Sequence, residues 1–419
     1  MKRKVLIYAH YYAPDVASTG QIVQDIAEGI SNEFDVTVIC VVPSYTGVIE
    51  DRYKTKNYYF EELNGVSIIR VRVPEFSKSS KFSRIKNILV YFIRALIASS
   101  KAGKQEYVLS ISQPPILGGL LGVIGKKIKS AKYVYNIQDF NPEQVMAVGY
   151  SKNFFILKVA MLLDKFSCRK SDLIITVGRD LVETLKKRFG NKNVPKHIMI
   201  NNWIDENTVH PLSYNDKGVV KFKQKFGLEN KFVVMYSGNI GLYYDLENLI
   251  KVIQEFKPET KSSDGRDVIF AFVGAGSILA ELKNYVKTYN MSNVCFIPYQ
   301  DKSELIYSLN AADVHWCVNV KGIKGVSCPS KAYGIMAVGK PIIGVLEEGT
   351  EIRSLIDDIG CGKCCEPGEY NDVKKIIQWY LDSSLDDLLA MGQLGRKHLD
   401  RCLTKEVSIK KYSDAISGV

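Results

Sequence analysis

Residues 231–245 read KFVVMYSGNIGLYYD, and the fold assignment starts from this stretch. An apolar run of strand length ends in a turn in which Gly238 and Gly241 flank Asn239, and a helical pattern begins near Asp245. A buried strand, a glycine turn and an amphipathic helix in this order are typical of a parallel sheet covered by helices. In such sheets ligands bind outside the carboxyl ends of the strands, which is where this turn is expected.

The same alternation extends in both directions along the chain. VLIYAH, VTVICVV, YVLSIS, YVYNIQD and DLIITVG precede the stretch, and VIFAFVG, NVCFIPY, ADVHWCV and KPIIGVL follow it. A loop rich in Asn, Asp and Pro, NNWIDENTVHPLSYND, interrupts the alternation. We therefore predict an α/β protein of two doubly wound, Rossmann-like domains, residues 1–208 and 209–403, with a final helix near 404–419 that packs back on the first domain.

Composition and charge narrow the class of protein. Of the 419 residues, 46% are hydrophobic and 24% charged, which is an ordinary globular mixture. The net charge of +11 arises in the first half: residues 1–210 carry 30 basic and 19 acidic side chains, and residues 211–419 carry 26 of each. The two halves are therefore expected to meet different partners.

Four other features are not expected in this chain. Cys361, Cys364 and Cys365 lack a second Cys or His pair nearby, so buried thiols are expected rather than zinc. Residues 107–125 carry no charge, but a Pro-Pro pair interrupts them, which favours a strand, loop and helix over a membrane span. The first residues lack a signal-peptide pattern, so we expect a cytoplasmic protein. No motif supports binding to nucleic acid.

Two glycine-containing turns are candidate phosphate sites. Thr19 and Gly20 precede a helix expected to start near Gln21, whose free amides suit an anion; a plain capped turn is the alternative. Gly274 follows another strand in FAFVGAGS. That turn lacks the third glycine and the later acidic residue of a dinucleotide site, so NAD binding is not expected.

Residues 326–345, VSCPSKAYGIMAVGKPIIGV, carry the main catalytic candidate. A helix is expected to begin near Pro329, which places Ser330 and Lys331 in its first turn. Lys331 offers a cation that could stabilise a departing diphosphate. The alternative is a capped core helix with a solvated lysine.

Together these motifs resemble a known family. The order of NNWID, SGNIG, ADV and PSK…GIMAVGKPII is similar to that of GT-B glycosyltransferases of family 4. NIQD-x-x-PE and PSK-x-YG further resemble the fucosaminyltransferase-like subgroup of bacterial O-antigen and capsule transferases.

The resemblance implies a retaining, metal-independent glycosyltransferase with no cofactor, working in a cleft between two domains. The donor, a UDP-sugar and by subgroup an N-acetylated amino-deoxy sugar, would bind to the second domain. A polyprenyl-diphosphate-linked or saccharide acceptor would bind to the first. The positions that match donor-binding motifs are Gly20, Gly238, Asn239, Tyr299, Ser330 and Lys331.

Two acidic residues could serve the acceptor. Asp139 and Glu143 end a first-domain strand, where either could bind an acceptor hydroxyl or act as base. A helix cap and a first-turn carboxylate are the alternative. The chain also departs from the family, because Val326 and Gly334 stand where many members carry two glutamates, and Asn239 and Leu242 to Tyr244 stand where many carry an Arg and a Lys. Those departures keep two other functions open: a nucleotide-sugar epimerase or hydrolase, and a scaffold without catalysis.

Residues 77–105 hold seven Lys or Arg and no acid, with apolar residues at helical spacing. We predict that this basic helix docks on an anionic membrane surface, through Lys78, Lys81, Arg84 and Lys86 among others. The alternative is a sheet-covering helix with a solvated basic edge.

Overall fold

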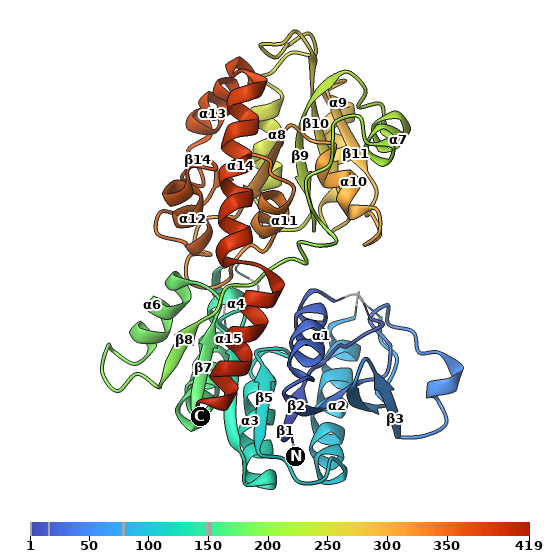
Figure 1. The fold of residues 1–419 in the computed structure, drawn as a ribbon, viewed down its shortest axis with the longest axis vertical. Helices are drawn as coiled ribbons and strands as arrows, with labels where there is room; N and C mark the ends of the chain where they lie inside the picture. The colour runs from blue at the N-terminus through green and yellow to red at the C-terminus, as the bar shows by residue number, and fades with distance from the viewer. Residues whose placement is uncertain (1, 16, 78–79, 148, 150–152) are drawn as a thin grey trace. The chain divides into compact units, whose positions relative to one another are not determined.

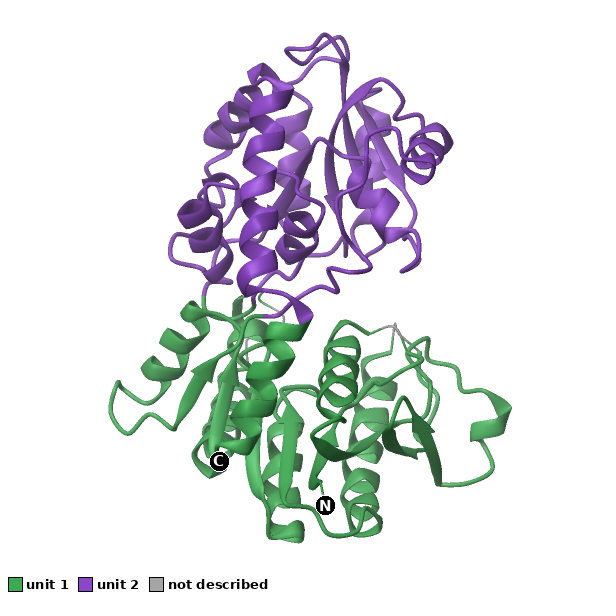
Figure 2. Cartoon of the chain, viewed as in Figure 1, with its two compact units in different colours: residues 1–201, 325–327, 406–419 green, residues 202–324, 328–405 purple. Residues whose placement is uncertain are grey.

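The computed structural model describes residues 2–15, 17–77, 80–147, 149 and 153–419, so Lys78 lies outside the described residues. The chain divides into two compact units, coloured separately in Figure 2. Unit 1 contains residues 1–201, 325–327 and 406–419, and unit 2 contains residues 202–324 and 328–405. Both are sheets flanked by helices (Figure 1), and the predicted fold class is confirmed.

Unit 1 holds an eight-stranded sheet in the order β3-β4-β2-β1-β5-β6-β7-β8. Only β3 runs antiparallel to its neighbour, and the other pairs are parallel. The strands are β1 (Arg3–Tyr8), β2 (Phe34–Val41), β3 (Tyr58–Leu63), β4 (Val66–Val71), β5 (Tyr107–Ile111), β6 (Lys132–Ile137), β7 (Leu173–Thr176) and β8 (His197–Met199).

The helices of unit 1 are α1 (Ser18–Ile30), α2 (Lys81–Lys101), α3 (Leu117–Lys129), α4 (Glu143–Ala147), α5 (Phe154–Lys170), α6 (Arg179–Arg188) and α15 (Lys405–Ser417), with a 3-10 turn η1 (Asp51–Tyr53). The crossovers through α1 and α3 run in opposite directions along the sheet, so their common right hand puts them on opposite faces. Residues Glu406 to Ser417 of α15 count with unit 1, where Ile409 packs against Gly29 of α1.

Unit 2 holds a six-stranded parallel sheet in the order β11-β10-β9-β12-β13-β14. The strands are β9 (Lys231–Ser237), β10 (Asp267–Val273), β11 (Val294–Ile297), β12 (Val314–Val318), β13 (Ile342–Val345) and β14 (Gly362–Cys365). The helices are α7 (Lys217–Phe226), α8 (Leu246–Ile253), α9 (Leu279–Thr288), α10 (Leu305–Asn310), α11 (Lys331–Ala337), α12 (Glu351–Ile359), α13 (Tyr370–Asp382) and α14 (Leu385–Cys402).

Some sequence expectations need correction at the level of elements. Helix α1 begins at Ser18, so Thr19 and Gly20 lie inside its first turn instead of preceding it. The cysteine-rich stretch supplies the edge strand β14, in which Cys364 and Cys365 pair with β13. Burial raises the pKa of the Cys365 thiol to about 12, and a thiol that is protonated at neutral pH is a poor metal ligand.

The uncharged stretch after Tyr107 folds as strand β5 and helix α3, as expected. Among the described residues, no helix combines the length and apolarity needed to cross a bilayer.

Candidate functional site

The candidate site in unit 2 lies where the order of its sheet reverses. Strands β9 and β12 are neighbours in the middle of the sheet, with β10 and β11 on one side and β13 and β14 on the other. Successive crossovers leave this point in opposite directions, and parallel sheets bind ligands at the carboxyl ends of the strands at such a point. The turn after β9 and the first residue of α11 meet there.

Glycines after β9 and after β10 allow the two loops to approach each other very closely. Gly238 has φ 145°, and its amide donates to the carbonyl of Val273 at 2.9 Å. A Cβ atom on Gly274 would lie 2.0 Å from the carbonyl oxygen of Gly238, and one on Gly238 would lie 2.5 Å from Cε of Lys331. The glycine turn therefore rests directly on the Lys331 side chain.

Lys331 is the first residue of α11, and two tyrosines surround its amine. Its Nζ donates to the hydroxyl of Tyr236 at 2.6 Å and lies 3.3 Å from the ring centroid of Tyr244. The Tyr236 hydroxyl in turn donates to the carbonyl of Asn239 at 2.6 Å, which ties the glycine turn to the amine. Contacts between an ammonium and aromatic faces favour the charged form only modestly.

Burial lowers the pKa of Lys331 from 10.5 to about 7, against a smaller opposing effect of Cys317. Among the ion pairs of the described residues, none joins Lys331 to a carboxylate. A bound anion would supply the missing counter-charge and return the amine to its protonated form. The arrangement suits a ligand with a phosphate group.

Three other predicted residues of unit 2 have exposed side chains. Ser330 precedes Lys331 and is exposed, with no side-chain bond to the helix. Asn239 is exposed at the tip of the turn. Tyr299 is 62% exposed and follows β11, which is two strands away from β9, so no described contact joins it to Lys331.

Sequence reasoning missed the two tyrosines around Lys331. Tyr236 was part of an apolar strand, and Tyr244 was noted only as a departure from the family. A tyrosine near the end of a buried strand needs a hydrogen-bond partner for its hydroxyl. That requirement could have pointed to Tyr236 from the sequence. The identity of the partner, however, depends on the pairing of β9 with β12.

In unit 1, Thr19 and Gly20 lie in the first turn of α1. No side chain caps this helix end, and a Cβ atom on Gly20 would lie 3.0 Å from the carbonyl oxygen of Tyr11. The carboxylate of Asp15 instead accepts from the amides of Ser44 and Tyr45, so it stabilises the neighbouring loop.

Asp139 follows β6 and meets a segment from much later in the chain. Residues 325–327 count with unit 1, where Asp139 forms a β-bridge with Ser327 and the Phe140 amide donates to the Val326 carbonyl at 2.9 Å. Burial raises the pKa of the Asp139 carboxyl, although a hydrogen bond from Ser327 opposes the shift. A carboxyl of raised pKa at a strand end is suited to proton transfer.

Glu143 has a different environment. Both of its carboxylate oxygens accept from the guanidinium of Arg188, which also pairs with the buried carboxylate of Asp164. The Arg188 guanidinium further donates to the Asn141 carbonyl at 2.8 Å. This network joins α4, α5 and α6, and it favours the first-turn, structural alternative for Glu143 over contact with an acceptor.

The two departures from the family fall in apolar surroundings. The Val326 side chain is 6% exposed. A Cβ atom on Gly334 would touch only Ile204 and Leu309, each at 3.4 Å. A glutamate at either position would place a carboxylate in a buried part of the chain, which costs free energy unless the charge is paired.

A buried histidine was also missed by sequence reasoning. His10 follows β1, beside β5 at the point where the order of the unit 1 sheet reverses. Burial lowers its pKa to about 4, so the ring is neutral, and its Nε2 has no hydrogen-bond partner among the residues that the structure describes. Its ring instead lies against Tyr11 and Tyr91.

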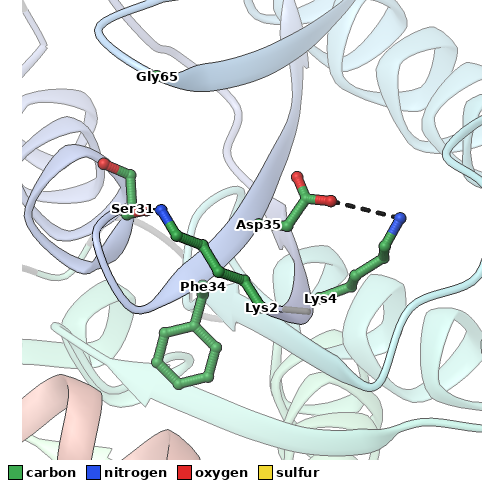
Figure 3. A pocket seen from close by; sticks show the side chains of 6 residues that line it. All are labelled: Lys2, Lys4, Ser31, Phe34, Asp35 and Gly65. Atoms are coloured by element: carbon green, nitrogen blue, oxygen red, sulfur yellow. Dashed lines mark hydrogen bonds and ion pairs between the residues drawn. The ribbon is translucent and has the colours of Figure 1, made fainter.

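Two further features bear on possible ligands. A pocket lined by Lys2, Lys4, Ser31, Phe34, Asp35 and Gly65 (Figure 3) lies at the amino-terminal ends of β1 and β2. That edge of the sheet is opposite to the one at which parallel sheets bind ligands. Two of the lining residues, Lys4 and Asp35, form an ion pair with each other. Within the described part of the chain, no group of three or more His, Cys, Asp or Glu is arranged to hold a metal ion.

Part of the chain matches a known family model. Residues 220–398 match the model "Glycosyl transferases group 1". The chain is 26% identical over 348 residues to a probable glycosyltransferase WbjE of Pseudomonas aeruginosa, with 82% of this chain and 83% of that protein covered. It is 23% identical to a putative colanic acid biosynthesis glycosyl transferase WcaI of Escherichia coli, with 99% and 100% covered.

Solved structures show the same fold. Sucrose-phosphate synthase from Thermosynechococcus elongatus matches with a TM-score of 0.76 at 13% identity, over 99% of this chain and 98% of that one. Anabaena Alr3699/HepE in complex with UDP and glucose matches with a TM-score of 0.69 at 14% identity, over 100% of both chains. The chain has the GT-B fold of glycosyltransferases.

Proposed function

We propose that this protein is a retaining glycosyltransferase that moves a sugar from a UDP-sugar to a lipid-linked or saccharide acceptor in the synthesis of a surface polysaccharide. The observation that carries the proposal is the Lys331 amine, which contacts the Gly238 turn at the switch point of unit 2 and has no carboxylate partner in the described part of the chain. The names of the WbjE and WcaI relatives support the reaction class, and the UDP in the HepE structure supports the nucleotide.

The reaction depends more on the stabilisation of negative charge than on a covalent bond between sugar and protein. The bond between the anomeric carbon and the β-phosphate oxygen breaks, and the acceptor oxygen forms a bond to the same carbon on the same face. The departing phosphate oxygen takes the acceptor proton, so UDP is the other product. The Lys331 ammonium neutralises the charge that develops on the diphosphate, and the glycine turn allows the diphosphate to lie close to the backbone.

The acceptor is proposed to bind to unit 1, with Asp139 as the residue that forms a hydrogen bond with its hydroxyl. The raised pKa of this carboxyl and its place after β6 support that role. Glu143 is not included, because Arg188 occupies both of its oxygens. Thr19, Gly20, Ser330 and Tyr299 remain proposed donor contacts.

The donor sugar and the metal requirement rest on the family resemblance. An N-acetylated amino-deoxy sugar on UDP is the proposed donor, and no metal or cofactor is proposed. The reaction is placed at the inner face of the plasma membrane, where the basic helix within residues 77–105 would meet a polyprenyl-diphosphate-linked acceptor.

Incubation with UDP-sugars, with and without a lipid-diphosphate sugar, tests the function. UDP release that depends on the acceptor supports the transferase. Conversion without an acceptor would indicate the epimerase or hydrolase instead, and absence of turnover with every donor would favour a scaffold. A thermal-shift series should show stabilisation by UDP above GDP and ADP, unchanged by EDTA; a shift that needs a divalent cation would contradict the metal-independent mechanism.

A further inference from the structure

Helix α2 has one buried side and, opposite to it, an exposed side that is apolar. One stripe, formed by Asn87, Tyr91, Ala95, Ala98 and Ser99, is buried against the rest of unit 1. The outward stripe is also apolar, and its members are Phe82, Ile85, Leu89, Ile93 and Ile97, exposed by 80%, 55%, 48%, 58% and 51%. A helix on a protein surface normally turns polar residues outward. The sheet-covering alternative therefore does not account for the outward side of α2.

Helix α5 has a second exposed apolar side. Its buried residues are Asp164, Ser167 and Cys168. The apolar residues of its exposed side include Phe154, Phe155, Ile156, Leu162, Leu163 and Phe166, exposed by 77%, 74%, 59%, 59%, 39% and 39%. Exposed apolar area of this extent marks a site of interaction.

Helix α3 joins these two sides into one surface. It packs against both α2 and α5. Its glycines press it onto the sheet, since a Cβ atom on Gly122 would lie 2.1 Å from the Tyr133 ring and one on Gly125 would lie 2.5 Å from the Tyr8 hydroxyl. The outward apolar residues of α2 and α5 therefore flank a recessed helix on the same face of unit 1. We call them the α2–α5 surface.

The most exposed part of the α2–α5 surface lies at one edge of the sheet. Phe82, Phe154 and Phe155 are the most exposed large apolar side chains of the described residues. All three lie in the first turns of their helices. Because α2 follows β4 and α5 follows β6, these first turns lie at the carboxyl edge, where Asp139 also lies.

The helices of this surface carry mostly positive charge. Helices α2, α3 and α5 contain 12 Lys and Arg residues and one acid. The acid is Asp164, which is buried and paired with Arg188. A second copy of the chain would bring the same positive charge to the surface, so like charges disfavour that occupant. Apolar residues surrounded by basic ones match an anionic bilayer, whose headgroups and acyl chains complement both.

We propose that the α2–α5 surface binds an anionic lipid bilayer, with Phe82, Phe154 and Phe155 inserted at the boundary between headgroups and acyl chains. The second helix, α5, extends the contact beyond the basic stretch recognised in the sequence. The proposal deepens the proposed function and rests on it in one respect: the carboxyl edge that carries Asp139 faces a diphosphate attached to a lipid of that bilayer.

Co-sedimentation of the full chain with vesicles tests the proposal. Vesicles of phosphatidylcholine alone are compared with equal mixtures of phosphatidylcholine and phosphatidylglycerol. We expect binding to the mixed vesicles, weakened by about tenfold or more in the triple variant F82S/F154S/F155S and by high salt. The control L385S/L389S, which changes two apolar residues of α14 that are each 44% exposed, should bind as the wild type does.

A second variant separates charge from apolar insertion. K86E/K158E reverses two exposed charges of the α2–α5 surface and should weaken binding to the mixed vesicles only. Equal binding by the wild type and the triple variant would overturn the proposal. So would a wild-type dimer in solution that the triple variant converts to monomers, because the surface would then cover a second copy.

The thermal shift produced by UDP is measured on the same samples. Lost vesicle binding with an unchanged UDP shift confirms that the variants are folded and isolates the membrane contact. Absence of a UDP shift in a wild type that binds vesicles would refute the proposed donor while leaving the α2–α5 surface supported.

Discussion

The amine of Lys331 lies 2.6 Å from the hydroxyl of Tyr236, although 95 positions separate the two residues in the sequence. The pairing of β9 with β12 brings them together. Because the Tyr236 hydroxyl also donates to the Asn239 carbonyl, one phenol couples the cation to the glycine turn.

Replacement of Lys331 should remove the charge that stabilises the departing diphosphate. We expect K331M to lower kcat by about a hundred- to a thousandfold, the effect typical of a lost electrostatic contact to the transition state. Turnover is measured as acceptor-dependent UDP release. K321M removes an exposed lysine of the loop between β12 and α11 and serves as the control. Equal losses in both variants would show that net charge, and not the position of Lys331, matters.

Binding of UDP should depend on pH through the same amine. The pKa of Lys331 is about 7 in the unliganded protein, so the amine is mostly neutral above this pH. A diphosphate that requires the ammonium must then bind together with a proton, and its Kd should rise by up to about tenfold per pH unit above 7. Titration calorimetry between pH 7 and 9 in buffers of different ionisation enthalpy measures both effects. In K331M the slope should disappear; a wild-type Kd independent of pH would count against the ammonium contact.

The free energy of unfolding of the unliganded protein should rise over the same pH range in which the binding of UDP weakens. The pKa of Lys331 falls from 10.5 to about 7 on folding, so between these values the unfolded chain binds more protons than the folded one. The free energy of unfolding therefore gains a contribution that rises with pH from 7 towards 10.5. Chemical denaturation at pH 7 and pH 9 should show a smaller gain for K331M than for the wild type.

Two glycine substitutions should separate the site from the fold. In G238A the new Cβ atom meets Cε of Lys331, a flexible side chain, whereas in G274A it meets the backbone carbonyl of Gly238. We expect G274A to destabilise the fold by about 1–3 kcal/mol, because a backbone must move and φ is 143°. G238A is also strained by its positive φ. For a given loss of stability, it should lose more UDP affinity than G274A does. Denaturation and UDP titration of both variants provide the comparison, and parallel losses would argue against a specific contact.

The two acidic candidates of unit 1 should respond differently. D139N should lower acceptor-dependent turnover with little effect on the melting temperature, because no ion pair of the described residues includes Asp139. E143Q should act mainly on stability, since it weakens the network of Arg188 and Asp164; removal of one partner of a buried pair costs about 3–5 kcal/mol. The readouts are kcat and Tm for each variant. A large loss of kcat in E143Q without a change in Tm would restore Glu143 as a candidate base.

The fold was largely predictable, because its signals are local. Apolar runs such as residues 231–237 and the turns that follow them depend on neighbours within a few positions, and the alternation of such units identified both sheets. The elements that were missed lack that signal. Strand β14 consists of Gly, Lys and two Cys, and its pairing with β13 gives it strand structure. Helix α1 starts at Ser18 without a capping side chain that would mark where the helix begins.

The site was predictable only in part. Lys331, Gly238 and Gly274 were recognised from motifs, and the structure brings these three together. Asp139 and Glu143 were indistinguishable in the sequence, since both follow the same strand. Only the folded chain gives one a raised pKa and the other a guanidinium, because Arg188 reaches Glu143 from 45 positions away.

The sequence by itself determined the α/β alternation, the excess of basic residues in the first half and the residue types at the strand ends. All of these follow from side-chain polarity and backbone preference over short distances. The tertiary structure decided which groups share a neighbourhood: the tyrosines around Lys331, the guanidinium on Glu143, and the apolar stripe of α2 that faces outward. Periodicity reveals that a helix has an apolar stripe, but packing against α3 and the sheet selects which side is buried.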